Sequence, residues 1–487
     1  MTVVAATVSL GAAGACAAPV VDAASGARFY VANGGSSGGP CSKSRPCSSL
    51  ARAVTLANHV AYGTPVTIYV GQGMFVTHLN FPDKLVNEPS LTIIGASESG
   101  TVLTARGSGQ VLFALTLAPN ITMEDLTISG ATGSASSQGG AVHWGGFTAD
   151  FTDVTFRDNS APANSYGGAV EDDGGIMNIT GSTFFHNSVG PTAAAGGGAI
   201  AEAGGTLTIT ASLFTDNTVT GVGTGGAIFI EDGKFSLVDS TVTGNTATGS
   251  ATGGAIGLDG QGTASIIGST LNGNTADGLG GLVDSVGTSH VGFGGDILVA
   301  NVGSVGSVCS GTGVKDLGHN VIDQHACGMG STSEVATAGA VGLLPLAANG
   351  GPTRTERIKK SSAAHDVVAK GATIGGKRFC AGVDERGVPR QQGPASKCDA
   401  GAYQFAPPVI TAISPHKGAP GVAVSIRGYG FDFLTLVFGG GHPRFTVSGD
   451  VAIATRVPSL GKGGVTITLS NPDGTAKTTF QVLSPPK

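Results

Sequence analysis

Charged side chains are scarce in this sequence. Asp, Glu, Lys and Arg together make up 12% of the 487 residues, about half of the share that is usual in globular proteins. The 26 basic and 32 acidic residues give a net charge of −6, and no basic run occurs. Because nucleic acids are bound through a basic stripe or patch, the sequence disfavours that class of partner.

Helical periodicity is missing as well. In the central part of the chain, apolar and polar residues alternate in short runs such as Leu207-Thr208-Ile209-Thr210, which is the pattern of a half-buried strand. Glycine is abundant, at 82 residues, but the 40% of hydrophobic residues are too many and too regularly placed for a disordered chain. The composition therefore favours an all-β protein.

One unit occurs five times between residues 139 and 274. It opens with Gly-Gly-Ala and a β-branched residue, and it closes with a bulky apolar residue three positions before an asparagine. Successive closing asparagines are separated by 28, 30, 28 and 29 residues, which indicates a repeat architecture. The units start at Gly139, Gly167, Gly197, Gly225 and Gly253, and they end at Asn159, Asn187, Asn217, Asn245 and Asn274.

Equivalent positions of the units carry similar apolar residues. One such column contains Phe151, Ile179, Ile209, Leu237 and Ile266, and another contains Val142, Val170, Ile200, Ile228 and Ile256. Coils of a parallel β-solenoid stack about 4.8 Å apart and require such columns, and their corner asparagines can hydrogen-bond from coil to coil. A propeller blade would need about 40 residues. The repeat therefore predicts a parallel β-helix.

The start of the chain has the composition of a secretory signal. Residues 1–24 are small and apolar and end in a cleavage-like segment, although no basic residues precede them. Cys16 is an alternative candidate for lipid attachment. A transmembrane helix is disfavoured, because the apolar run is short and contains Gly and Pro. We expect an exported protein.

The other six cysteines form three pairs of sequence neighbours. An even number in local pairs is typical of disulfides in an oxidising compartment, whereas no Cys-x-x-Cys and no suitably spaced His point to a metal site. The predicted disulfides join Cys41 to Cys47, Cys309 to Cys327 and Cys380 to Cys398.

The chain divides into five parts by pattern. After residues 1–24 come an N-terminal cap and first coils (25–130), the repeated coils (131–300), further coils with a disulfide-bearing cap (301–406) and a C-terminal domain (407–487). Within the first coils, Ser48 or Ser49 is placed to cap a short amphipathic helix with Leu50, Ala53 and Ala57 on one face. Residues 276–300 depart most from the repeat, and we expect a loop there, followed by one degenerate coil from Gly294.

Family resemblances accompany these motifs. The first coils resemble those of pectin-lyase-like right-handed β-helices, and the repeated unit resembles the repeats of chlamydial polymorphic outer-membrane proteins, which are surface adhesins. The segments Leu317-Gly318-His319-Asn320, Asn349-Gly350-Gly351-Pro352 and Asp384-Glu385-Arg386-Gly387 resemble the choice-of-anchor Q family of exported β-helix proteins. That family implies no shared catalytic residue and a variable attachment device.

Residues 408–482 resemble IPT/TIG domains, which are small immunoglobulin-like sandwiches. The matching segments include Ile413-Ser414-Pro415, Gly430-Phe431 and Asn471-Pro472-Asp473-Gly474. The length and the short alternating strands suit such a sandwich. The resemblance implies a spacer or contact module. The predicted fold class is thus all-β, a right-handed parallel β-helix followed by a small β-sandwich.

Carboxylates gather just after the Gly-Gly-Ala corners. Asp172 and Glu202 share one offset from the alanine, and Asp173 and Glu231 share the next. Stacked carboxylates of adjacent coils would lie about 5 Å apart, a separation found in retaining glycosidases and also suited to Ca²⁺. The candidate ligand-binding residues are Trp144 and His143. Trp144 is the only tryptophan and could stack on a sugar ring. Acidic residues are also ordinary at turns.

Two functions follow from these features. The first is a non-catalytic adhesin or glycan-contacting scaffold, secreted or at the bacterial surface and monomeric, with a polysaccharide or cell-surface glycan as partner. The alternative is a polysaccharide lyase or glycoside hydrolase that uses the carboxylates named above. The Asn-Thr-Asp of polygalacturonases is missing, so the scaffold is favoured. No cofactor or metal is predicted beyond the Ca²⁺ alternative.

Overall fold

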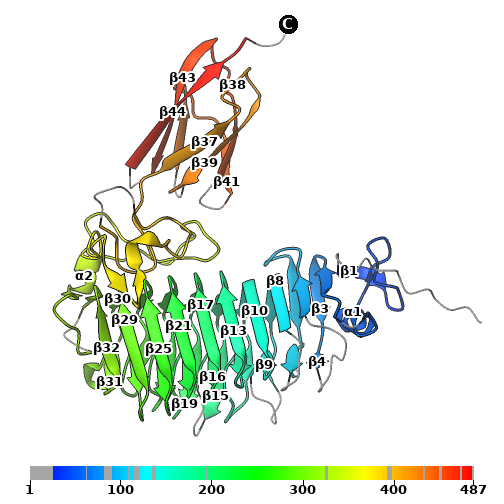
Figure 1. Ribbon diagram of the computed structural model, residues 1–487, viewed down its shortest axis with the longest axis vertical. Coiled ribbons are helices and arrows are strands. Elements are labelled where there is room, and N and C mark those ends of the chain that lie inside the picture. The colour runs from blue at the N-terminus through cyan, green and yellow to red at the C-terminus, as the bar shows by residue number, and fades with distance from the viewer. Residues whose placement is uncertain are drawn as a thin grey trace, which may run out of the picture.

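The computed structural model describes residues 26–484 except 62, 82–89, 108, 115–119, 134–138, 193–195, 324–326, 392–396, 432–433, 449–451 and 472–473. It confirms the predicted fold class: parallel strands wind into an elongated solenoid, and a β-sandwich follows at the C-terminal end (Figure 1). The signal-like residues 1–24, with Cys16, lie outside the described residues. No helix in the described part is long and apolar enough to cross a membrane.

Three parallel sheets form the walls of the solenoid. The largest has 20 strands, and its first arm contains β1 (Ala27–Ser36), β2 (Val66–Val70), β5 (Ser90–Ile94), β8 (Asn120–Ser129), β10 (Thr148–Arg157), β13 (Ile176–Thr180), β17 (Thr206–Thr210), β21 (Lys234–Val238), β25 (Thr263–Ile267), β29 (His290–Gly294) and β32 (Val314–Gly318). The second arm continues the long strands β8 and β10 and adds β3 (Gly73–Val76), β6 (Thr101–Thr104), β14 (Thr183–Phe185), β18 (Leu213–Thr215), β22 (Thr241–Thr243), β26 (Thr270–Asn272), β30 (Ile297–Val299), β33 (Val321–Ile322) and β34 (Glu334–Val335).

The other two walls are shorter. One sheet has nine strands: β4 (Leu79–Phe81), β7 (Leu112–Ala114), β9 (Val142–Trp144), β12 (Val170–Asp172), β16 (Ile200–Ala203), β20 (Ile228–Glu231), β24 (Ile256–Asp259), β28 (Val283–Ser285) and β31 (Cys309–Gly311). The other has five: β11 (Ser160–Ala161), β15 (Ser188–Thr192), β19 (Thr218–Gly221), β23 (Thr246–Gly249) and β27 (Thr275–Ala276).

The strand register confirms both predicted columns. Phe151, Ile179, Ile209, Leu237 and Ile266 are successive partners, as are Val142, Val170, Ile200, Ile228 and Ile256. All ten side chains are fully buried. Aromatic side chains stack in the same way, since the rings of Phe156, Phe184 and Phe214 lie 4.6 Å apart from coil to coil. Burial of such columns is the main stabilising contribution to the solenoid.

The closing asparagines form a hydrogen-bonded ladder, as predicted. Each side-chain amide donates to the carboxamide oxygen of the next, over 2.8–3.1 Å, and the ladder runs through Asn159, Asn187, Asn217, Asn245, Asn274 and Asn301. A second ladder was not predicted. In it the hydroxyl oxygens of Ser182, Ser212, Ser240 and Ser269 accept backbone N–H groups of the preceding coil.

The Gly-Gly corners have a steric cause. The first glycine of a pair has a positive φ, as at Gly167 (+59°), and a Cβ on the second, Gly168, would lie 2.1 Å from the carbonyl oxygen of Gly198. Only glycine fits both positions, because the corners of adjacent coils are in direct backbone contact.

Residues 276–300 are not a loop, and that expectation was wrong. They form a complete coil: Gly280-Gly281-Leu282-Val283 replaces the opening phrase, β28, β29 and β30 join their sheets in register, and Asn301 extends the ladder. Leucine in place of the alanine hid this unit from the repeat pattern.

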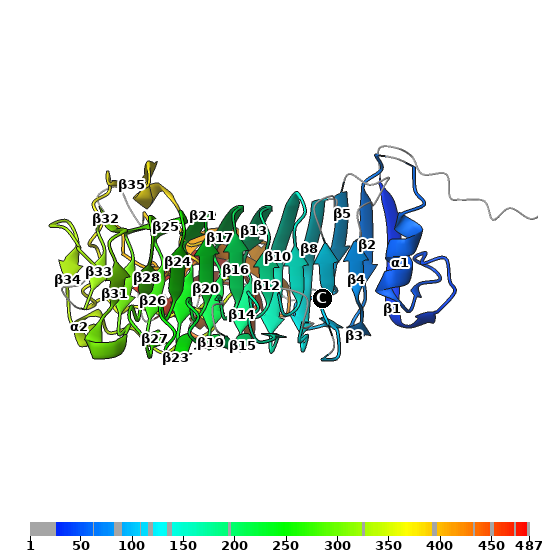
Figure 2. The ribbon, with the colours of Figure 1, turned by 90° about the horizontal axis from the view of Figure 1, so that it is seen from below.

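Each end of the solenoid carries a cap. At the N-terminal end the predicted helix is present as α1 (Leu50–Ala57), with Ser49 as N-cap and Leu50, Ala53 and Ala57 buried (Figure 2). At the other end lies the short helix α2 (Ala338–Val341). All three predicted disulfides are present, Cys41–Cys47, Cys309–Cys327 and Cys380–Cys398.

The described part of residues 343–405, here called the C-terminal cover, folds back over the second arm of the large sheet and contains the hairpin of β35 (Thr373–Ile374) and β36 (Lys377–Arg378) (Figure 1). Its carboxylates accept hydrogen bonds from the sheet: Glu385 from Thr241, and Glu356 from Thr243 and Asn272. Arg390 reaches Asp239 and the carbonyl oxygen of Gly268. The cover is therefore attached to the coils by buried polar contacts.

The Asp384-Glu385-Arg386-Gly387 motif forms the centre of this attachment. The Arg386 guanidinium donates two hydrogen bonds to Asp384 and lies 3.7 Å from the ring centroid of Tyr403. Burial raises the pKa of Glu385 well above its ordinary value, and hydrogen bonds from Thr241 and Thr353 oppose that rise. The Asp384-Glu385-Arg386-Gly387 segment thus holds the cover in place.

Two four-stranded sheets make up the C-terminal sandwich. One contains β37 (Val409–Ser414), β39 (Ala423–Tyr429), β42 (Ala452–Arg456) and β41 (Phe445–Ser448), and the other β38 (Lys417–Gly418), β44 (Gly474–Val482), β43 (Gly463–Asn471) and β40 (Thr435–Phe438). Their inner faces bury a separate core that includes Ile426, Phe438 and Ile467.

Candidate functional site

The candidate carboxylates stack as the offsets predicted. Asp172 on β12 pairs with Glu202 on β16, and Trp144 on β9 precedes both in the same column. Asp173 follows at the end of β12, while Glu231 on β20 pairs with Ala203 and Asp259. The predicted columns therefore exist, and the direction in which each one faces decides its chemistry.

The column of Trp144, Asp172 and Glu202 faces the interior of the solenoid. All three side chains have an exposed fraction of 0%, and the next residue of the column, Ile230, belongs to the apolar core. Trp144 therefore has no free face on which a sugar could stack, and neither carboxyl reaches the surface. Alternation along β12 and β16 points this offset inward.

Glycine turns close over the two buried carboxyls. The N–H of Gly175 donates to Asp172 Oδ1 over 3.0 Å, and the N–H of Gly205 donates to Glu202 Oε1. Burial raises the pKa of both carboxyls, and for Glu202, next to Asp172, the value is about 10. At neutral pH this pair of carboxyls therefore retains a proton.

A second pair lies on the outer side of the same strands. His143 Nε2 is 3.4 Å from Glu171 Oε2, both side chains are buried, and the ring of Phe113 lies 5.1 Å from that of His143. Burial raises the pKa of Glu171 to about 8, with smaller contributions from Asp173 and Asp172. His143, a candidate contact residue, thus pairs with a carboxyl to which the sequence assigned no role.

An open groove of about 450 Å³ lies directly above the glycine turns. Its floor consists of backbone at Gly146, Gly174-Gly175 and Gly204-Gly205, and its rim carries Phe147, Ile176, Asp232 and Lys234. Phe147 is 64% exposed and Ile176 48% exposed. The sequence did not identify Phe147 or Ile176 as candidates. Their side chains are accessible because the neighbouring turns consist of glycine and carry no side chains that would cover them.

The remaining candidates lie beside this groove. Asp173 is exposed and Glu231 is half-buried, and the hydroxyl of Tyr166 has a raised pKa because of burial and of the carboxylates Glu231, Glu171 and Asp259. Glu231 and the exposed Asp259 occupy paired positions on β20 and β24, and both act on Tyr166.

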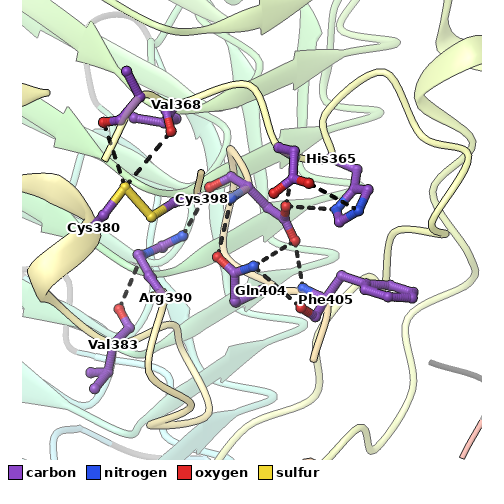
Figure 3. Close-up of a disulfide and its surroundings, with 11 residues drawn as sticks. His365, Val368, Cys380, Val383, Arg390, Cys398, Gln404 and Phe405 are labelled. Carbon is purple, nitrogen blue, oxygen red and sulfur yellow. Dashed lines mark hydrogen bonds and ion pairs between the residues drawn. A yellow bond between two sulfur atoms is a disulfide. The ribbon is translucent and has the colours of Figure 1, made fainter. Parts of the chain in front are cut away.

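One group of side chains in the cover has the composition of a metal site. His365 Nδ1 is 2.8 Å from Asp399 Oδ1, and His365 Nε2 is 3.6 Å from Asp366 Oδ2. Asp399 also accepts from Gln404 and the N–H of Phe405, next to the Cys380–Cys398 disulfide (Figure 3). These bonds already use both Asp399 oxygens, so we interpret the group as a structural ion-pair network. The Ca²⁺ alternative at the carboxylates just after the Gly-Gly-Ala corners is not tested by the structure.

A second groove, of about 520 Å³, lies where the cover ends on the sheet. It is lined by Thr127, Thr155 and Thr183, by Glu98 and by Arg157 and Arg354. Burial raises the pKa of Glu98, which accepts a hydrogen bond from Thr155. Acidic and basic groups are mixed here, and no exposed aromatic ring lines the groove.

Comparison with curated proteins found no match. Among solved structures, a putative phosphatase from Bacteroides thetaiotaomicron is similar at 21% identity (TM-score 0.14). The similarity covers only 16% of this chain and 18% of the phosphatase chain. A rhamnogalacturonan lyase is similar at 11% identity over 64% of this chain and 87% of that chain (TM-score 0.40). A pectin methylesterase from carrot is similar at 10% identity, with 64% and 89% covered (TM-score 0.33).

At these identities and TM-scores, the similarities say nothing about activity. The C-terminal sandwich has a firmer relationship. Residues 408–482 match the model of the IPT/TIG domain, which confirms the resemblance found in the sequence for this part of the chain.

Proposed function

We propose that this protein is an exported, non-catalytic β-helix that contacts glycans through the groove above the glycine turns. The observation that carries the proposal is Phe147, whose ring is 64% exposed at the rim of a groove floored by backbone. An exposed aromatic face beside polar groups is a suitable surface for a sugar ring, which has apolar C–H faces and hydroxyl edges.

The neighbouring groups complete such a surface. Asp232 and Lys234 offer an acceptor and a donor at one end, while Ile176 adds apolar area beside Phe147. Because the glycine turns recur in successive coils, the groove has length along the solenoid axis and suits a chain rather than a single small molecule.

Three disulfides support export, since such bonds persist in oxidising compartments. The adhesin role and surface location follow from the resemblance to choice-of-anchor Q proteins and to outer-membrane-protein repeats, which remains a prediction. In this proposal the IPT/TIG domain acts as a spacer or second contact module, and the protein is a monomer.

A panel of immobilised glycans tests the proposal with the oxidised full chain. We expect binding without turnover, and Phe147→Ala should weaken it about two- to tenfold, because a lost aromatic contact is worth about 0.5–1.5 kcal/mol. Val222→Ala, which truncates an apolar side chain that is 57% exposed and lies outside the groove, is the matched control. Cleavage of any polysaccharide in the panel, or equal binding by both variants, would overturn this function.

A further inference from the structure

The carboxyl groups of Asp172 and Glu202 lie in adjacent coils, directly beneath the groove floor. Strands in register place them about 4.8 Å apart along the axis. Both are fully buried, in a column whose neighbours are Trp144 and Ile230.

The donors around the pair account for only half of its acceptor atoms. One oxygen of each carboxyl receives a glycine N–H, Asp172 Oδ1 from Gly175 and Glu202 Oε1 from Gly205. The other two oxygens, Asp172 Oδ2 and Glu202 Oε2, are buried and receive no donor from the rest of the described structure. A proton held between the two carboxyls would supply the missing hydrogen bond, as in other paired acids.

The charged groups that act on the pair from within the described structure are acidic. They include Glu171 on β12 and Asp173, which follows that strand. The adjacent positions on β9 and β20 are an indole and an isoleucine, and the turns above are glycine. Two ionised carboxylates here would repel each other in a medium of low polarity, which makes the doubly ionised state costly.

We infer that Asp172 and Glu202 share one proton in the folded protein and that loss of this proton opens the glycine floor, so that alkaline conditions switch off the groove. This regulation rests on the glycan contact proposed above. The proton passes to hydroxide in the solvent, and the pair then carries two negative charges. Relief comes from hydration, and the shortest route for water is through the turns at Gly174-Gly175 and Gly204-Gly205, which have no side chains to displace.

The expected range follows from the group that releases the proton. Burial and the neighbouring Asp172 raise the pKa of Glu202 to about 10. The floor should therefore be closed at neutral pH and open near pH 10. Trp144, the only tryptophan and the neighbour of Asp172 in the column, reports directly on that opening.

The test is acrylamide quenching of Trp144 fluorescence between about pH 6 and 11, with no glycan present. In the wild-type protein, quenching should rise with a midpoint near pH 10. In Glu202→Gln it should not, because the glutamine amide supplies a permanent donor to Asp172. Glu231→Gln, the same change one coil further on at a half-buried position, should keep the wild-type midpoint. Asp172→Asn should also remove the rise, and it replaces Glu202→Gln if that variant does not fold.

Two results would overturn the inference: quenching that stays flat to pH 11 in the wild-type protein, or the same midpoint in Glu202→Gln as in the wild-type protein. The glycan panel, repeated at about pH 7 and 10.5, separates this outcome from failure of the proposed function. Absence of binding at pH 7 refutes the glycan contact but leaves the quenching result intact. Binding that persists while quenching rises refutes only the coupling between the proton and the groove.

Discussion

Replacing Asn217 by alanine should destabilise the solenoid by roughly 4 kcal/mol. The side chain is fully buried and makes four hydrogen bonds. It donates to the carbonyl oxygen of Phe184 and to Asn245 Oδ1, and it accepts from the backbone and side-chain N–H groups of Asn187. Each buried hydrogen bond contributes about 1 kcal/mol net, and the partners left unpaired add a desolvation cost.

Unfolding by denaturant, followed through Trp144 with the disulfides oxidised, measures this loss. Since the only tryptophan lies in the solenoid, the signal excludes the C-terminal sandwich. Asn178→Ala is the matched control, because the side chain of Asn178 is half-buried and its amide makes one hydrogen bond, to Asp150. That control should cost about 0.5–1.5 kcal/mol. If Asn217→Ala cost no more than Asn178→Ala, the ladder would be a by-product of stacking rather than a source of stability.

Other perturbations test the remaining buried groups. Between about pH 4.5 and 8, the raised pKa of Glu171 keeps its carboxyl protonated in the folded protein, whereas the same carboxyl is ionised in the unfolded chain. Its contribution to the free energy of unfolding is therefore complete below about pH 4.5 and is lost as the pH rises towards 8. Glu171→Gln should therefore remove about 1.4 kcal/mol per pH unit from the dependence of the unfolding free energy between pH 5 and 8, and an unchanged slope would contradict the assignment. Arg386→Ala leaves Asp384 buried without its ion-pair partner and should destabilise the cover by about 3–5 kcal/mol. Limited proteolysis within residues 343–405 should then be faster than in Arg354→Ala, a control at an exposed arginine of the same segment. Replacing Cys380 and Cys398 together by alanine opens a loop of 18 residues and should cost about 3 kcal/mol; a transition at the same denaturant concentration would show that the polar contacts alone hold the cover.

The repeat determined the solenoid from the sequence alone. Spacing of the Gly-Gly pairs and asparagines specifies one coil per unit, and columns such as Val142 to Ile256 are equivalent because identical coils must stack in register. For the same local reason the capping helix after Ser49 and the three cysteine pairs were predicted correctly. Where a unit departed from the pattern, at Leu282 in place of alanine, the local signal failed although the backbone kept the same path.

Only the tertiary structure decided what the acidic corner does. Glu171 and Asp172 are consecutive in the sequence, yet strand alternation places the first on the outer side and the second inside the solenoid. The sequence predicted a disulfide-bearing cap within residues 301–406 but not its return over the sheet, because the contacts join residues far apart in the chain, such as Thr241 and Glu385. The repeated sequence is enough to predict that the coils stack, because each unit carries its own pattern. The side on which a given side chain lies, and the contact of a distant segment with the sheet, depend on the three-dimensional path of the coils.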